Sequence, residues 1–292
     1  MDDARLREAL EAGRRRDYRK AIEILEPLAA GTSTAGTSPG GTGAAPEVFL
    51  YLGRSWHAKD NPSRAIQYLK IYIRLCPDDG AGWFFLGRSY LAAGRYPAAI
   101  SALKKSFTLN SNSLDALGLL AAAYLKARNS AAALRFFELA LTLAPDSPQL
   151  NQGYRNALFI EAVRTLRRGE AVLAAQMFSF LLRNGQEGVP LRLYSGHALR
   201  DSGQLEGALA QYQAACAIAP EDTSLVWYVI SALFSLGRRG EADALIGDLD
   251  PGEAEGMVPQ QWTEQMADVR IMREHVIGGK WQNAVELGRL YI

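Results

Sequence analysis

The residues of this chain best able to do chemistry are three histidines and two cysteines. His57, His197 and His275 are far apart in the sequence, and none has a second ligand at metal-site spacing. Cys76 and Cys216 each fall near the end of an expected helix, without a neighbour that would activate a thiol. Their separation also argues against a disulfide framework. We therefore expect no catalytic residues, no metal site and no cofactor, and predict that the chain is not an enzyme.

The composition excludes several further classes of function. The chain has 292 residues, 48% of them hydrophobic, with a formal net charge of +1. Its basic residues are scattered, so nucleic-acid binding is not expected. The N-terminus lacks the basic start and apolar run of a secretory signal, and no apolar stretch approaches the roughly 18 residues of a membrane span. We expect a cytoplasmic protein without membrane insertion.

The pattern that organises the chain is clearest in residues 80–112. Trp83, Leu86 and Tyr90 fall on one face of a predicted helix, which stops at Gly94. A second amphipathic helix begins at Tyr96, so the stretch predicts a helical hairpin. Small residues at positions 87 and 99 would allow the two backbones to approach closely.

This hairpin recurs at a spacing of 34 residues. The same residue types return at positions that share one face of each helix: Phe49, Leu52, Gly53, Trp56 and Ala65; then Trp83, Leu86, Gly87, Tyr90 and Ala99; then Leu117, Leu120, Ala121, Tyr124 and Ala133. After Pro145 the spacing lengthens by seven residues. This predicts that the helix from about Pro148 to Arg168 is two turns longer than its equivalents. The 34-residue spacing then returns.

An aromatic residue followed by Leu-Gly, Tyr, Ala, Phe, Ala and Pro at a 34-residue period resembles the tetratricopeptide repeat (TPR). The resemblance covers nearly the whole chain, with about seven to eight repeats. It implies an all-α fold: a right-handed superhelical solenoid of antiparallel helix pairs. The first helices of such an array line a concave groove that binds peptides or partner proteins. We expect residues 1–292 to form a single TPR solenoid.

Two segments interrupt this pattern. Residues 31–46 are rich in Gly, Ser and Thr and predict a flexible insertion. A tolerated surface loop is the favoured interpretation, and a mobile lid or modification site is the alternative. Residues 247–259 predict a loop before a last helix pair, residues 260–277 and 281–292. The apolar side chains of that pair favour either self-association or a longer natural chain as much as a frayed end.

The resemblance also implies which residues face the groove. At the fifth, sixth and ninth positions of the first helices, aromatic side chains and two arginines one repeat apart recur: Tyr51, Arg54, Phe84, Phe85, Arg88, Tyr194, His197, Trp227 and Tyr228. Aromatic anchors with guanidinium groups suit a partner that offers apolar groups and carboxylates. Two alternatives stay open: the arginines are paired with acidic neighbours or solvated, and some of the aromatics at the sixth position belong to the core between repeats. The lysines and asparagines that bind chaperone C-termini in one subclass are absent.

The leading hypothesis is therefore a non-catalytic protein-interaction scaffold that binds a peptide or partner segment in its concave groove. The alternative is a regulatory or substrate-recruiting TPR portion of a larger enzyme, for example a glycosyltransferase, or of an enzyme assembly.

Overall fold

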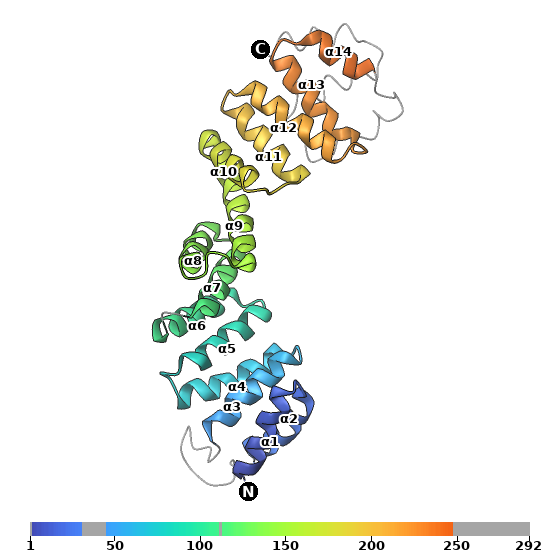
Figure 1. The fold of residues 1–292 in the computed structure, drawn as a ribbon. Coiled ribbons are helices and arrows are strands. Elements are labelled where there is room, and N and C mark those ends of the chain that lie inside the picture. Colours follow the sequence, from blue (N-terminus) through green and yellow to red (C-terminus); the bar gives the residue numbers. More distant parts are fainter. Residues whose placement is uncertain (1, 31–44, 111–112, 248–292) are drawn as a thin grey trace. The chain divides into compact units, whose positions relative to one another are not determined.

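The computed structural model describes residues 2–30, 45–110 and 113–247, shown as coloured ribbon in Figure 1. This part of the chain is all-α, as predicted, and contains no strand. It divides into two compact units, unit 1 (Met1–Ala157) and unit 2 (Leu158–Ile292). Each unit is described by itself, and the single solenoid over residues 1–292 stays a prediction.

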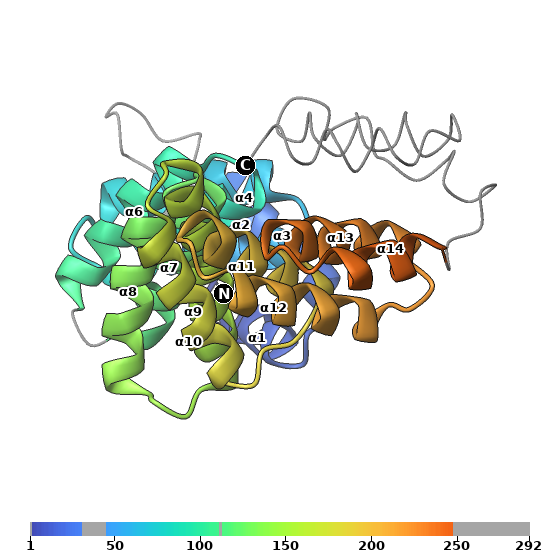
Figure 2. The same ribbon diagram turned by 90° about the horizontal axis from the view of Figure 1, so that it is seen from above.

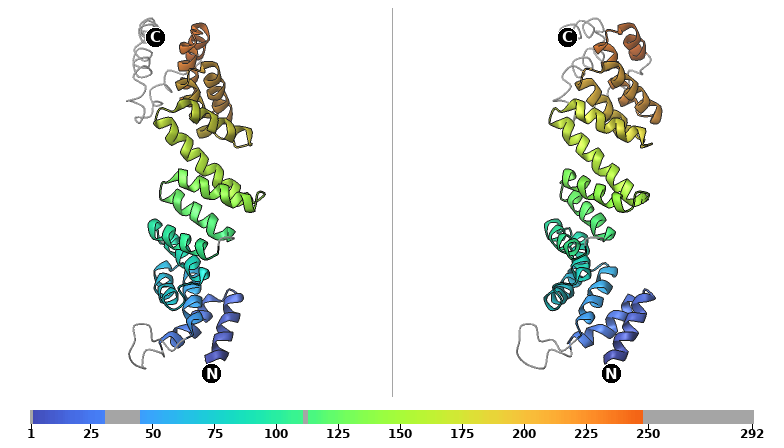
Figure 3. Two further views of the ribbon diagram at one scale, coloured as in Figure 1. Left: turned by 90° about the vertical axis from the view of Figure 1, so that its left-hand side faces the viewer. Right: turned by 60° about the vertical axis from the view of Figure 1, so that its left-hand side comes forward.

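Antiparallel helix pairs make up unit 1, and each helix lies against the next along the chain (Figures 1 and 3). The helices are α1 (Asp2–Arg14), α2 (Tyr18–Ala30), α3 (Pro46–Ala58), α4 (Pro62–Leu75), α5 (Gly80–Ala92), α6 (Tyr96–Leu109), α7 (Leu114–Lys126) and α8 (Ser130–Leu143). First helices begin at residues 46, 80 and 114 and second helices at 62, 96 and 130, so the 34-residue period is confirmed.

The next helix, α9 (Pro148–Arg167), begins in unit 1 and ends in unit 2. It has 20 residues, whereas α3, α5 and α7 have 13 each, which confirms the predicted extension by two turns. Unit 2 continues with α10 (Ala171–Arg183), α11 (Val189–Asp201), α12 (Leu205–Ile218), the 3-10 helix η1 (Thr223–Leu225), α13 (Val226–Ser235) and α14 (Arg239–Gly247). The view from above shows α13 and α14 side by side (Figure 2).

The turn inside each helix pair has one residue with positive φ. The seven positions are Arg16, Asp60, Gly94, Arg128, Gly169, Gly203 and Gly237. At Gly94, φ is +70°, a conformation that glycine adopts without steric cost. The next N–H then bonds back into the first helix, as from Arg95 N to the Tyr90 carbonyl at 2.9 Å, which satisfies a carbonyl of the last turn. The positive φ therefore recurs at the same repeat position even where the residue is not glycine.

Side-chain caps mark several helix starts that the sequence predicts. The Asp79 carboxylate accepts a hydrogen bond from Ala81 N at 3.0 Å, and the Ser113 hydroxyl accepts one from Ala116 N at 3.2 Å. Each cap satisfies one backbone N–H that has no partner within its helix.

Small residues let the two helices of a pair cross closely, as expected. A Cβ added to Gly87 would lie 2.6 Å from Cγ of Leu103, well inside van der Waals contact, and Ala99 is fully buried beside this crossing. Gly53 meets Leu69 in the same way, and Gly196 meets the ring of Tyr212. The predicted close approach is confirmed.

Some predictions fall outside the described residues. Within the expected insertion 31–46, the structure describes only Ala45 and Pro46, and Pro46 is the first residue of α3. In the expected loop 247–259, only Gly247 is described, as the last residue of α14. The last helix pair, its proposed self-association and His275 also lie outside the described residues.

Candidate functional site

Four of the residues predicted to face a groove lie together on α3 and α5 of unit 1. The guanidinium carbon of Arg54 is 4.7 Å from the ring centroid of Phe85 and 5.4 Å from that of Tyr51. Arg88 follows Phe85 by three residues on α5, hence on nearly the same face of that helix. The 34-residue spacing thus brings two arginines and two aromatic rings from neighbouring repeats onto one surface.

Arg54 and Arg88 are exposed, and neither forms an ion pair within the described ranges. Arg64, on the next helix, behaves differently. Its guanidinium lies 3.2 Å from the Glu26 carboxylate and 4.5 Å from the ring centroid of Trp56. The alternative in which acidic neighbours neutralise Arg54 and Arg88 is therefore not what the structure shows. Two unneutralised cations remain at the surface of α3 and α5.

His57, on α3, is a partly buried neighbour of the two arginines in the sequence repeat. Its Nδ1 is 3.4 Å from the Ser89 hydroxyl of α5. Burial lowers the pKa of His57, and the charge of Arg88 lowers it further, while Asp60 opposes the shift. The lowered pKa favours the neutral form of His57, whereas Arg54 and Arg88 carry positive charge at this surface.

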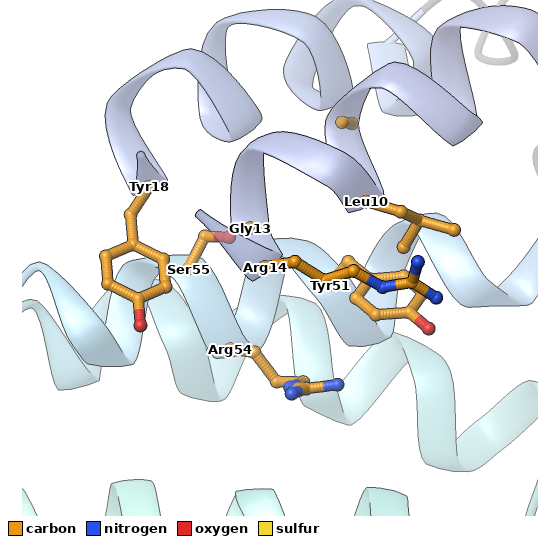
Figure 4. Close-up of a pocket in the computed structure, with 8 residues that line it drawn as sticks. Leu10, Gly13, Arg14, Tyr18, Tyr51, Arg54 and Ser55 are labelled. Atoms are coloured by element: carbon orange, nitrogen blue, oxygen red, sulfur yellow. The ribbon is translucent and has the colours of Figure 1, made fainter. Parts of the chain in front are cut away.

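A pocket adjoins Arg54 on the side of α1 (Figure 4). It has a volume of about 310 Å³ and is lined by Leu10, Gly13 and Arg14 of α1, Tyr18 of α2, and Tyr51, Arg54 and Ser55 of α3, together with Ala9. None of the described residues that line it carries a carboxylate. Two tyrosine rings and two guanidinium groups therefore surround one hollow.

Sequence reasoning missed the α1 and α2 side of this pocket. Because α2 begins at Tyr18 and α4 at Pro62, the first pair lies 44 residues before the second rather than 34. Shifting by 44 places Leu10 at the position of Arg54 and Arg14 at that of Ala58. Extending the ninth position into the first pair with this corrected spacing would have found Leu10. Arg14 follows four residues later and so lies on the same face of α1.

Phe84 has different surroundings from Phe85, although the two residues are adjacent and their ring centroids are 5.2 Å apart in an edge-to-face contact. Phe84 packs against the cluster of Ala99, Leu103 and Leu120, between α5 and the next repeat. It thus contributes to the core between repeats, although it holds the fifth position and the alternative interpretation concerned aromatics at the sixth.

In unit 2, Tyr194 and His197 belong to a chain of ring contacts. Tyr194 meets the rings of Phe159 and Phe178, with centroids 5.8 and 6.3 Å away. The Tyr212 hydroxyl and Nδ1 of His197 are 2.9 Å apart and share a hydrogen bond. Burial, with a smaller contribution from Arg200, lowers the pKa of His197 to about 4, so this ring is neutral at physiological pH. These two residues are partly buried packing residues.

Trp227 and Tyr228 lie deeper in the core. They are 7% and 2% exposed, in a cluster that joins α12 to α13 and includes Leu209 and Leu233. Such burial leaves almost no side-chain surface for a partner. The predicted site residues therefore divide into two groups. Arg54 and Arg88 are exposed beside the partly buried rings of Tyr51 and Phe85. Phe84 and the predicted residues of unit 2 pack in the core.

The described residues show no group of histidine, cysteine and acidic side chains that could hold a metal ion. Cys76 and Cys216 are partly buried free thiols, and burial raises the pKa of the Cys216 thiol, which makes it less reactive. Among the helices that the structure describes, none is long and apolar enough to cross a membrane.

Comparison with known proteins identifies the repeats. Models described as tetratricopeptide repeat match residues 6–80 and 90–156. No curated protein sequence shows a significant match to the chain.

Solved structures are similar in fold at low sequence identity. A crystal structure of MamA is 17% identical, with 72% of this chain and 92% of that chain covered and a TM-score of 0.41. PilF of Pseudomonas aeruginosa is 15% identical, with 75% and 92% covered and a TM-score of 0.45. A thermophilic TPR protein of Thermus thermophilus is 18% identical, with 80% and 99% covered and a TM-score of 0.40.

Proposed function

Because this chain is a tetratricopeptide-repeat protein, we propose that it is a non-catalytic scaffold that binds an extended segment of a partner protein. The repeats support an interaction scaffold in general. We assign the contact to one face of α3 and α5, which carries the exposed Arg54 and Arg88 and the partly buried rings of Tyr51 and Phe85. We call these four residues the arginine–aromatic face.

One observation carries this proposal: Arg54 and Arg88 are exposed and form no ion pair in the described part of unit 1. A guanidinium group offers five N–H donors and binds carboxylates in a bidentate way. Arg54 is held over two rings, so less of its side-chain freedom is lost when a ligand binds. Aromatic and arginine side chains are also the residue types that most often dominate the energy of protein interfaces.

The charge of the first half of the chain agrees with this choice of partner. Lysine and arginine outnumber aspartate and glutamate by 19 to 14 in residues 1–150 and are outnumbered by 13 to 17 in residues 151–292. A partner segment with carboxylates would therefore be attracted to unit 1, more strongly at low ionic strength.

The test is a pull-down with the full chain, read by mass spectrometry, that compares wild type with the double variant Arg54→Glu and Arg88→Glu. We expect a specific set of captured proteins to be lost from the double variant. The matched control is Arg95→Glu with Arg135→Glu, which changes the charge equally. Both arginines are exposed, Arg95 directly before α6 and Arg135 within α8. Capture that survives Arg54→Glu with Arg88→Glu, or that both double variants lose equally, would remove the arginine–aromatic face from the function.

A further inference from the structure

We propose that the pocket between α1 and α3 binds the acidic side chain of a partner segment, with glutamate the best fit. This inference rests on the proposed function, since the pocket shares Tyr51 and Arg54 with the arginine–aromatic face. It adds a carboxylate-binding pocket on the α1 side of Arg54.

The lining groups match a carboxylate on a short apolar stem. Arg14 and Arg54 supply two guanidinium groups from different helices, and Tyr18 and Tyr51 supply rings and hydroxyl groups (Figure 4). Leu10 gives the pocket an apolar wall against which methylene groups can pack. A volume of about 310 Å³ is ample for one side chain.

The charges that face the pocket leave it cationic. Glu11, on α1, is the carboxylate in contact with Arg14. It lies 4.0 Å from that guanidinium at high exposure and is closer to Arg15, at 3.1 Å. Exposed pairs of this kind neutralise each other weakly. Arg14 therefore keeps most of its capacity to bind a ligand.

The C-terminal end of α1 also opposes an anion. A helix C-terminus acts roughly as half a negative charge. Here the carbonyls of Glu11, Ala12 and Gly13 accept hydrogen bonds from Arg15, Asp17 and Arg16 N–H groups, which partly offsets it. Two full positive charges from Arg14 and Arg54 exceed this opposing effect.

Gly13 provides a way to close the pocket without changing its charge. It lines the hollow, lies within α1, and an added Cβ would meet nothing within 4 Å. Gly13→Leu should therefore place a side chain in the space reserved for the ligand. Because leucine is a better helix former than glycine, α1 should stay folded.

The experiment measures binding of a fluorescein-labelled hexaglutamate peptide to the full chain by anisotropy at low salt, against hexaglutamine. We expect hexaglutamate to bind at least tenfold tighter than hexaglutamine. Gly13→Leu and Arg14→Ala should each weaken hexaglutamate binding about tenfold or more. The matched controls are Gly240→Leu, another helical glycine with open space around its Cβ, and Arg15→Ala. Both controls should stay within about twofold of wild type.

Equal affinity for the two peptides would overturn the proposal, and so would hexaglutamate binding that Gly13→Leu leaves unchanged.

Arg88 lies outside the pocket, so variants of Arg88 test the proposed function separately from this inference. If Arg88→Glu abolishes partner capture while Gly13→Leu does not alter hexaglutamate binding, the pocket proposal fails and the scaffold function stands. If hexaglutamate binding depends on Gly13 while Arg88→Glu leaves partner capture unchanged, the pocket stands and the α5 contact of the proposed function fails.

Discussion

The ninth residue of a first helix differs in exposure and charge between the two units. In unit 1 it is Arg54 in α3 and Arg88 in α5, both exposed and charged. In unit 2 it is His197 in α11, partly buried, neutral and hydrogen-bonded to Tyr212. The repeat position alone therefore does not determine whether a residue meets a partner or the core.

The difference originates on the second helix of each pair. Gly53 and Gly87 face the leucines Leu69 and Leu103, whereas Gly196 faces Tyr212 at the equivalent position. A leucine side chain fills the space where the two helices cross and carries no polar group beyond it. Tyrosine fills the same crossing and extends a hydroxyl group to His197, which draws the ninth position into the core. A substitution on the second helix can thus convert an exposed ninth position into a packed one.

Breaking the glycine crossings should have the largest effect. Gly87→Leu should lower the free energy of unfolding by on the order of 1–3 kcal/mol, and Gly196→Leu should reach the upper end of that range or exceed it. The reason is that Leu103 can change its side-chain torsion angles, whereas the Tyr212 ring is rigid and held by neighbouring rings. Hydrogen exchange, read separately for each unit, would measure both losses. A smaller loss at Gly196 than at Gly87 would contradict the explanation by ring rigidity.

Acid should destabilise unit 2 through His197. Its pKa falls from the usual 6.5 to about 4 in the folded chain. The unfolded chain therefore binds this proton first. Stability is complete above about pH 6.5 and is lost as the pH falls towards 4, by on the order of 3 kcal/mol at most. Hydrogen exchange of α11 and α12 at several pH values would show the loss.

His197→Gln provides the control for this effect, because glutamine keeps a polar group near Tyr212 and does not titrate. The variant should show a shallower pH dependence in unit 2 over the same range. An equal slope in wild type and variant would mean that carboxylates, not His197, dominate the acid response.

The smallest predicted effect concerns the stacking of Arg54 over Phe85. A double-mutant cycle with Arg54→Met and Phe85→Leu should give a coupling energy of about 0.5–1 kcal/mol in thermal unfolding of unit 1. The cycle of Arg88→Met with Phe85→Leu is the comparison, since Arg88 stacks on no ring within the described residues. Coupling of equal size in the two cycles would show that charge near the ring, rather than stacking, holds Arg54.

The helix pairs, their spacing and the longer α9 could be predicted because they depend on periodicity within the chain. The burial of individual groove residues could not. Tyr51 and Tyr228 hold the same repeat position, yet Tyr228 is buried because Tyr212 and His197 pack against it from α12 and α11. Arg14 was missed for a different reason, because the first helix pair lies out of register with the period.

The helix starts at residues 80 and 114 have a consequence for the gene. Both helices are preceded by a residue whose side chain caps them, Asp79 and Ser113. Loss of the 34 codons for residues 80–113 would join Asp79 directly to Leu114 and place a capping side chain before α7 once more. Duplication of the same segment would add a helix pair with an equally capped start. The number of pairs can therefore change during evolution without new chemistry at the junction.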